Sequence, residues 1–340
     1  MFEYGSMPKR TIANNFIVVI FSALISVIPS ACHRPVVEGG RPPLFDGEAT
    51  DFQAAKVVGR IESGEITESS GIAVSKCQEN VLWTHNDSGD GPFVFAMDAT
   101  GRDLGTWKVT GAENIDWEDI ATFRDAGGKC FVYVSDTGNS RRDPRTELKV
   151  YRFAEPTVAG SGPRSTRKEP APTAPAEVLV FSYPDEPQDA ETLLVHPASG
   201  EIYIATKDRK RAAGVYALGA VFGGQLITGR KVSDLTVPAI PNGFLTGGDI
   251  SPDGRHLIIC DDFAAYEFTL PPGNADFNNI WKQKPAVVEL GDRKQGEAVG
   301  YSADGNSIFA TSEGKNPPLI RVNRRQIKTA ALRKRRSHLL

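Results

Sequence analysis

The chain has few cysteines, little net charge and no long apolar segment, and each of these scarcities excludes a class of protein. Its 340 residues include four cysteines, none in a C-x-x-C or Cys/His zinc spacing, which argues against a metal centre built on thiolates. The net charge is -3, so nucleic acid is not an expected partner. The main apolar run, residues 16–28, is shorter than the roughly 20 residues of a transmembrane helix. The sequence also lacks a G-x-S-x-G elbow, a P-loop and an H-E-x-x-H motif, which argues against common serine hydrolases, NTPases and zinc peptidases.

The N-terminus has the pattern of an export signal. Lys9 and Arg10 precede the apolar run "FIVVIFSALISVI", which is followed by "PSAC" ending at Cys32. This order predicts a signal peptide over residues 1–32, a tether over 33–50 and export to the periplasm or cell envelope. "SAC" resembles the end of a bacterial lipobox, which implies lipidation of Cys32 and attachment to a membrane. Pro29 departs from that pattern, so simple secretion stays open as the alternative.

The rest of the chain repeats one polar strand end. Five β-rich runs end in acidic residues: "VLWTHNDSG" at 81, "CFVYVSDTGN" at 130, "EIYIATKDRK" at 201, "HLIICDDFAA" at 256 and "SIFATSEGKN" at 307. Each run follows another strand across a short turn, such as the glycine-containing turns "PASGE", "SPDGR" and "SADGN". A third strand follows each pair, and a fourth follows in all units but the last. Repeated four-stranded units are typical of a β-propeller.

The count of strands predicts how the propeller closes. The fifth unit lacks a fourth strand, and an unassigned strand at 54–61 precedes the first unit. We therefore expect an all-β fold of five four-stranded blades over residues 51–323, closed by the N-terminal strand, with a basic tail at 324–340. Six blades are the alternative, if a degenerate unit lies in 155–176. That segment lacks apolar periodicity and is typical of a flexible, proline-rich insertion.

The repeated acids are expected to converge at one mouth of the central channel. Adjacent strands of a blade are antiparallel, so the start of the first strand and the end of the second share a face. This arrangement predicts an inner column of Ser70, Glu118, Glu191, Asp249 and Glu297, and a second ring of Asp87, Asp136, Asp208, Asp262 and Glu313. Oxygen ligands from several strands suit calcium, and we expect Glu118, Glu191, Asp249 and Glu297 to bind it. Hydrogen-bond networks that hold neighbouring blades together are the alternative role for these acids.

Other polar residues near the predicted mouth have candidate roles in catalysis and substrate binding. The candidate catalytic residues are His85, Asp87, Glu118 and Glu191, and the candidate substrate-binding residues are Asn86, Arg141, Arg142 and Lys207. Acids that hold a metal, flanked by cationic side chains, suit an anionic small molecule. His85 is suited to act as a base or proton shuttle, or it is simply a hydrogen-bonded residue at a strand end.

The motifs "NIDWEDIA", "QDAETLLV", "HNDSG" and "SDTGNS" give the chain a family resemblance. It resembles secreted bacterial propellers related to calcium-dependent phytase-like and gluconolactonase-like or paraoxonase-like proteins. The resemblance implies a calcium-dependent hydrolase, expected to be a monomer, that acts on a phosphate ester or a lactone. Phytases and lactonases normally have six blades, which departs from the five counted here. The alternatives are a glycoside hydrolase with paired channel carboxylates, acting on a sugar ligand, and a noncatalytic propeller that binds a ligand or a protein.

The positions of the cysteines predict one disulfide. Cys77 lies in the hairpin loop of the first blade, and Cys130 begins the second strand of the next. Both positions fall on the face opposite the acidic mouth, in neighbouring blades, so a bridge is feasible if the Cα atoms approach within about 7 Å. Cys260, in the middle of a strand, is expected to stay reduced.

Overall fold

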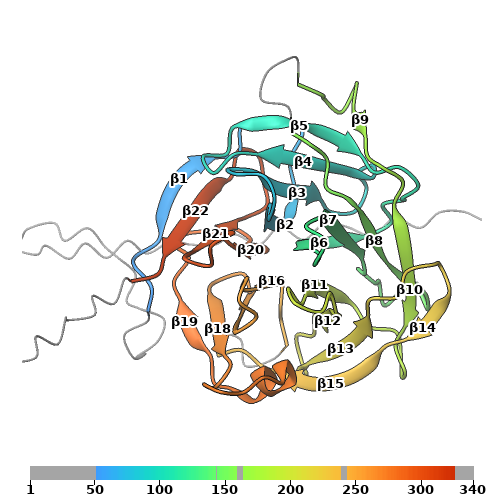
Figure 1. Ribbon diagram of the computed structural model, residues 1–340, viewed down its shortest axis with the longest axis vertical. Coiled ribbons are helices and arrows are strands. Elements are labelled where there is room, and N and C mark those ends of the chain that lie inside the picture. Colours follow the sequence, from blue (N-terminus) through green and yellow to red (C-terminus); the bar gives the residue numbers. More distant parts are fainter. Residues whose placement is uncertain (1–50, 143, 159–163, 239–242, 326–340) are drawn as a thin grey trace, which may run out of the picture. The chain divides into compact units, whose positions relative to one another are not determined.

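The computed structural model describes residues 51–325, apart from 143, 159–163 and 239–242. The predicted signal peptide, Cys32 and the tether lie outside the described residues, as does the tail beyond residue 325. Among the residues that are described, no helix is long and apolar enough to cross a membrane. The described chain forms five antiparallel blades around a central channel, as Figure 1 shows. The five-blade prediction is therefore confirmed, and the six-blade alternative is wrong.

Each blade runs from an inner strand at the channel to an outer strand at the rim. Blade 1 contains β2 (Ser69–Val74), β3 (Leu82–Asn86), β4 (Phe93–Met97) and β5 (Asp103–Lys108). Blade 2 contains β6 (Trp117–Arg124), β7 (Cys130–Asp136), β8 (Leu148–Ala154) and β10 (Glu177–Ser182). Blade 3 contains β11 (Ala190–Val195), β12 (Ile202–Thr206), β13 (Ala213–Gly219) and β15 (Arg230–Leu235).

Blades 4 and 5 complete the ring. Blade 4 contains β16 (Gly247–Ile250), β17 (His256–Cys260), β18 (Ala265–Thr269) and β19 (Ala286–Val288), with a 3₁₀ helix η1 (Phe277–Lys282) before the last strand. Blade 5 contains β20 (Ala298–Tyr301), β21 (Ser307–Thr311), β22 (Pro318–Asn323) and β1 (Lys56–Arg60). Since β1 pairs antiparallel with β22, the N-terminal strand closes the ring as predicted.

Two short parallel strands extend the outer edges of blades 1 and 2. Within the proline-rich insertion, β9 (Ala171–Pro172) pairs with β5, and the backbone N–H of Thr106 bonds to the Ser165 carbonyl at 3.2 Å. Part of the predicted flexible insertion is therefore held against blade 1. β14 (Leu226–Thr228) pairs with β10 of blade 2, although it directly precedes β15, the fourth strand of blade 3. The two parallel additions cover strand edges that would otherwise be free to pair.

The core lies in layers between neighbouring blades. Trp83 and Trp117 are fully buried there, in a cluster that blades 1 and 2 share, and both indoles donate hydrogen bonds. The hairpin turns on the opposite face from the acidic strand ends depend on glycine. Gly200, Gly254 and Gly305 have φ values of 70°, 69° and 70°, a left-handed backbone conformation that residues with a Cβ rarely adopt. Tight turns of this kind set the register of each hairpin.

Candidate functional site: an acidic mouth beside a cationic cleft

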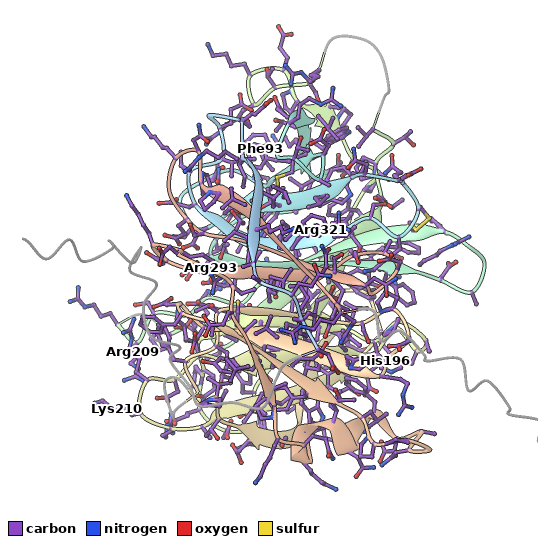
Figure 2. The ribbon with its side chains drawn as sticks, turned by 90° about the vertical axis from the view of Figure 1, so that its left-hand side faces the viewer. Phe93, His196, Arg209, Lys210, Arg293 and Arg321 are labelled. Carbon is purple, nitrogen blue, oxygen red and sulfur yellow. A yellow bond between two sulfur atoms is a disulfide. The ribbon has the colours of Figure 1, made fainter. Side chains whose placement is uncertain are left out.

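β-Bulges position the central acids of the site. Strand pairing shifts register at Ser70 in β2, at Glu118 in β6 and at Glu191 in β11. A bulged residue has no partner across the ladder, and the local kink re-aims its side chain. In blades 2 and 3 the re-aimed side chains are glutamates. Figure 2 shows the propeller from the side, so its two faces point in opposite directions. Arg209 and Lys210 of the β12–β13 loop lie on one face, and His196 of a hairpin turn lies on the other.

Glu118 is the centre of the acidic cluster. It forms one group with Asp87 and Asp116 and a second group with Asp189 and Glu191, and the ligand oxygens of each group lie within 4.8 Å of one another. Its predicted neighbour Glu191 is thus brought into contact range. Asp116 and Asp189 were not among the predicted ligands. Their signal in the sequence is a D-x-E pattern that occurs as "DWE" and "DAE" at the start of two inner strands.

Gly138 makes room for these carboxylates. A Cβ at this position would lie 2.0 Å from Glu118 Oε1 and 2.4 Å from the Asp116 carboxyl carbon. Any side chain here would therefore displace the cluster. The glycine lets the backbone that follows β7 pass directly against two acids.

Burial and mutual repulsion change the acidity of the cluster. Burial, with the charge of Asp87, raises the pKa of Asp116 to about 6. Burial raises the pKa of Glu191 to about 8, against the opposing effect of Lys207. The pKa of Glu118 also lies well above its usual range, because the carboxyl is buried and faces Glu191. A bound cation would relieve this repulsion, and a set of carboxylate oxygens from several strands fits calcium.

Lys207 is a cation within the cluster. Its ammonium donates a hydrogen bond to Glu191 Oε2. Burial lowers the pKa of Lys207, but the charge and hydrogen bond of Glu191, together with the charges of Glu297 and Glu118, outweigh burial and raise it. Glu297, predicted as a metal ligand, lies close enough for its charge to help raise the pKa of Glu191. Its carboxylate accepts hydrogen bonds from Gln295 Nε2 at 3.0 Å and Ser70 Oγ at 3.5 Å. Burial, then the charge of Glu297, raises the pKa of Glu313 to about 8.

A cleft of about 950 Å³ opens beside the acidic cluster, between blades 2 and 3. Asp189 and Glu191 line it together with five cationic residues: Arg141, Lys207, Arg209, Lys210 and Arg211. Phe244 forms an apolar part of the wall and stacks under Arg209 and Lys207. Of the predicted substrate-binding residues, Arg141 and Lys207 thus line the cleft. Arg142 and Asn86 are not among its lining residues.

His85 and Asn86 are engaged within the protein. His85 is fully buried, its ring packs edge-on against Trp117 at 5.8 Å, and its Nδ1 lies 2.9 Å from the Asn86 carbonyl oxygen. Burial lowers the pKa of His85 to about 4, so the ring is neutral at physiological pH. The side chain of Asn86 accepts from the backbone N–H of Thr67 at 3.0 Å and donates to Asp90. These contacts favour the interpretation of His85 as a hydrogen-bonded strand-end residue.

Asp249 is placed deeper in the channel than the other predicted ligands. It pairs with Ile258, which lies two residues before the end of β17. Glu191 lies at the very end of its strand pair, because its neighbours Ala190 and Thr192 pair with the last two residues of β12. The Asp249 carboxylate accepts the N–H of Ile250 at 2.8 Å and the N–H of Tyr301 in blade 5 at 2.9 Å, and it lies 4.0 Å from Lys76. Asp249 is therefore not grouped with Glu118 and Glu191, and it links two blades instead.

Asp119 makes the same kind of link between blades 2 and 3. Its carboxylate accepts the N–H of Ile120 at 2.8 Å and the N–H of Leu193 at 2.9 Å. The alternative role that the sequence left open, hydrogen bonding between blades, thus describes Asp119 and Asp249.

Two acids of the predicted second ring have cationic partners. Asp136 is fully buried and pairs with Arg145 at 2.7 Å, and Asp208 pairs with Arg211 at 2.9 Å. Asp87 of the same ring joins the Glu118 cluster instead. The second ring is therefore divided between neutralised acids and acids that face the cluster.

Comparisons with known proteins assign no family to this chain. No family model and no curated protein matches the sequence. Similar solved structures include the PQQ-bound aldose sugar dehydrogenase from Streptomyces coelicolor, with a TM-score of 0.45, 11% identity and coverage of 79% of this chain and 98% of that one. A luciferin-regenerating enzyme matches with a TM-score of 0.39 and 12% identity over 76% of this chain and 91% of its own. The RRP9 WD40 repeats match with a TM-score of 0.40 and 8% identity over 80% and 99%.

Proposed function

We propose that the acidic mouth binds calcium and that the protein hydrolyses an anionic small molecule, a phosphate ester or a lactone. One observation carries the proposal: Glu118 belongs to two groups of close carboxylates, and one of them borders a cleft lined with cationic side chains. The acids suit a hard divalent cation, and the arginines and lysines suit an anion beside it.

Particular residues take separate roles in this proposal. Glu118, Asp189 and Glu191 would hold the ion, and Lys207 engages only Oε2 of Glu191, which leaves the other oxygen for the metal. When bound, calcium would polarise the substrate oxygen on which negative charge develops. Arg141 and Lys207 bind the anionic group in the cleft. Asp87, partly exposed at the edge of the cluster, is positioned to accept a proton from water.

The disulfide supports a location outside the cytoplasm. Cys77 and Cys130 are joined, the pairing expected from the sequence, with a Cα–Cα distance of 6.2 Å. Disulfides persist in oxidising compartments such as the periplasm. We therefore place the proposed activity in the cell envelope.

Calcium binding is tested by thermal unfolding of the full chain with calcium and with a chelator. At a calcium concentration about 100 times Kd, binding stabilises the folded state by about 2.7 kcal/mol, which raises Tm by several degrees. Glu118→Gln should remove most of this shift. Glu289→Gln, which makes the same change at an exposed position of blade 4, should keep it. A melting curve that chelator does not change in the wild-type chain would refute the calcium site.

The reaction is tested with a panel of phosphate monoesters, phosphodiesters, lactones and aryl glycosides, each assayed with and without calcium. Hydrolysis of an ester or lactone that needs calcium and is lost in Glu118→Gln supports the proposal. Sugar cleavage without metal would indicate a glycoside hydrolase instead. Calcium binding without turnover of any compound would indicate a noncatalytic ligand-binding propeller.

A further inference from the structure

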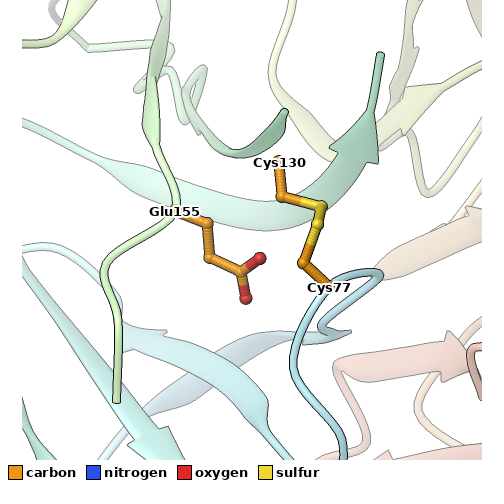
Figure 3. Close-up of side chains that lie close together, drawn as sticks. All are labelled: Cys77, Cys130 and Glu155. Carbon is orange, nitrogen blue, oxygen red and sulfur yellow. A yellow bond between two sulfur atoms is a disulfide. The ribbon is translucent and has the colours of Figure 1, made fainter. Parts of the chain in front are cut away.

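The disulfide lies against a carboxylate on the face opposite the acidic mouth. Cys77 belongs to the β2–β3 hairpin of blade 1, and Cys130 begins β7 of blade 2. Glu155 follows β8 directly, and its backbone N–H bonds to the Cys130 carbonyl oxygen at 2.9 Å. Figure 3 shows its carboxylate beside the two sulfur atoms. The two sulfurs and a Glu155 oxygen all lie within 4.8 Å of one another.

Two hydrogen bonds hold the Glu155 carboxylate in place and leave one oxygen available. Oε1 accepts from Trp83 Nε1 at 2.8 Å and from Gln78 Nε2 at 3.0 Å. Oε2 is buried and has no hydrogen-bond partner among the described residues. A buried carboxylate oxygen without a partner is costly unless another group satisfies it. The disulfide supplies no donor for this purpose.

Reduction of the disulfide would free both sulfurs to bind a metal beside Glu155. A dithiol reductant cleaves the S–S bond, is itself oxidised to a cyclic disulfide, and delivers its two protons to the sulfurs of Cys77 and Cys130. Cys77 is exposed, so the reductant can reach its sulfur. Both protons then leave as the thiols bind a metal as thiolates.

The ligand set selects a soft divalent cation. With zinc–sulfur bonds of about 2.3 Å, the two sulfurs of a tetrahedral site lie about 3.8 Å apart. After reduction the two sulfurs need only move apart from bonding distance to this separation, and Cys77 lies on a turn. Two thiolates and one carboxylate favour zinc over calcium, and the exposure of Cys77 leaves the fourth position open to water.

We propose that the Cys77–Cys130 disulfide covers a latent zinc site in which Glu155 is the third protein ligand. The site lies on the opposite face from the acidic mouth and depends on different chemistry. Its existence is therefore independent of the proposed hydrolytic function.

Cobalt(II) serves as an optical probe of the site, because cobalt–thiolate bonds absorb in the near ultraviolet. The full chain is reduced with a dithiol, freed of reductant without oxygen and titrated with cobalt, and the oxidised chain is treated in parallel. We expect one cobalt per reduced chain with thiolate charge-transfer absorption, its displacement by zinc, and no such band for the oxidised chain. Absence of the band after reduction, or loss of the folded circular dichroism spectrum, would overturn the proposal.

Variants test which residues bind the metal. Glu155→Gln keeps an acceptor for Trp83 and Gln78, so it should fold, but it should weaken cobalt binding by at least about tenfold, since even outer-shell changes cost about 10–100-fold. Glu79→Gln, on the same exposed hairpin, is the matched control and should bind as the wild type does. Cys77→Ser combined with Cys130→Ser should remove the band while Cys260 remains. Equal affinity in Glu155→Gln and the wild type would exclude Glu155 as a ligand.

Discussion

The ammonium of Lys207 donates a hydrogen bond to the carboxylate of Glu191 at the mouth of the channel. The acidic cluster therefore contains a cation of its own, on the side that borders the cleft. Lys207 stabilises the charged form of Glu191 but not enough to offset burial, since the pKa of Glu191 still rises to about 8. The cluster is thus only partly neutralised by the protein itself.

Stability should depend on pH in a direction set by these raised pKa values. Burial raises the pKa of both Glu191 and Glu313 from 4.5 to about 8. Between those values the folded state holds protons that the unfolded state has released, so the free energy of unfolding falls as pH rises. We expect the protein in chelator to be more stable at about pH 5 than at about pH 8, as measured by urea unfolding. Calcium should restore stability at the higher pH, and a flat profile in chelator would contradict this interpretation.

Removing the charge of Lys207 should steepen that dependence. Lys207→Met keeps the length of the side chain and leaves Glu191 beside other acids without a cation. We expect a lower free energy of unfolding at about pH 8 and little change at about pH 5, where Glu191 is protonated in both proteins. Lys210→Met is the matched control on the same loop, at an exposed position. Equal pH profiles for the two variants would show that Lys207 does not stabilise the cluster.

Asp249 should contribute to stability without contributing to calcium binding. Asp249→Ala would leave the N–H of Tyr301 and the ammonium of Lys76 without their acidic partner, at a cost of roughly 3 kcal/mol. Urea unfolding with and without calcium measures both effects. Calcium should raise the free energy of unfolding of Asp249→Ala as much as it raises that of the wild type. Asp249→Asn, which keeps one acceptor oxygen, should lose less. Loss of the calcium-dependent stabilisation in both variants would indicate that Asp249 is a calcium ligand.

The disulfide should stabilise the pair of blades that it links. It joins residues 53 apart in sequence, and the loss of such a loop closure costs up to about 4 kcal/mol. We expect Cys77→Ser combined with Cys130→Ser to lower the free energy of unfolding by a comparable amount. Alkylation of the unfolded, non-reduced protein should label Cys260, which is unpaired and buried, but neither of the bridged cysteines. Labelling of Cys77 in exported protein would contradict the bridge.

Export should place the mature protein in the cell envelope. The basic residues, the apolar run and "SAC" at the N-terminus predict cleavage of a signal peptide. Cell fractionation should recover a shortened chain outside the cytoplasm, and an intact N-terminus in the cytoplasm would refute export. Labelling with a palmitate analogue that Cys32→Ala abolishes would support lipidation. Secretion without label would favour the alternative.

The sequence by itself determined the number of blades, the closing strand and the pairing of Cys77 with Cys130. These features follow from local patterns, because a strand–turn–strand unit is recognisable from its own residues, and its turns fix which strand ends share a face. The convergence of Glu118 and Glu191 at one mouth followed from the same alternation. The D-x-E pattern was also present in the sequence, although its two aspartates became visible as neighbours only in space.

Only the tertiary structure decided which acids form the cluster. Bulges at Glu118 and Glu191 re-aim two glutamates, whereas β16 pairs with β17 without a register shift and places Asp249 deeper, between two blades. Leu226–Thr228 likewise joined the neighbouring blade by parallel pairing. Register and bulges arise from hydrogen bonds between strands and from packing between blades. Because those forces act between residues far apart in the chain, the pattern within one repeat does not specify them.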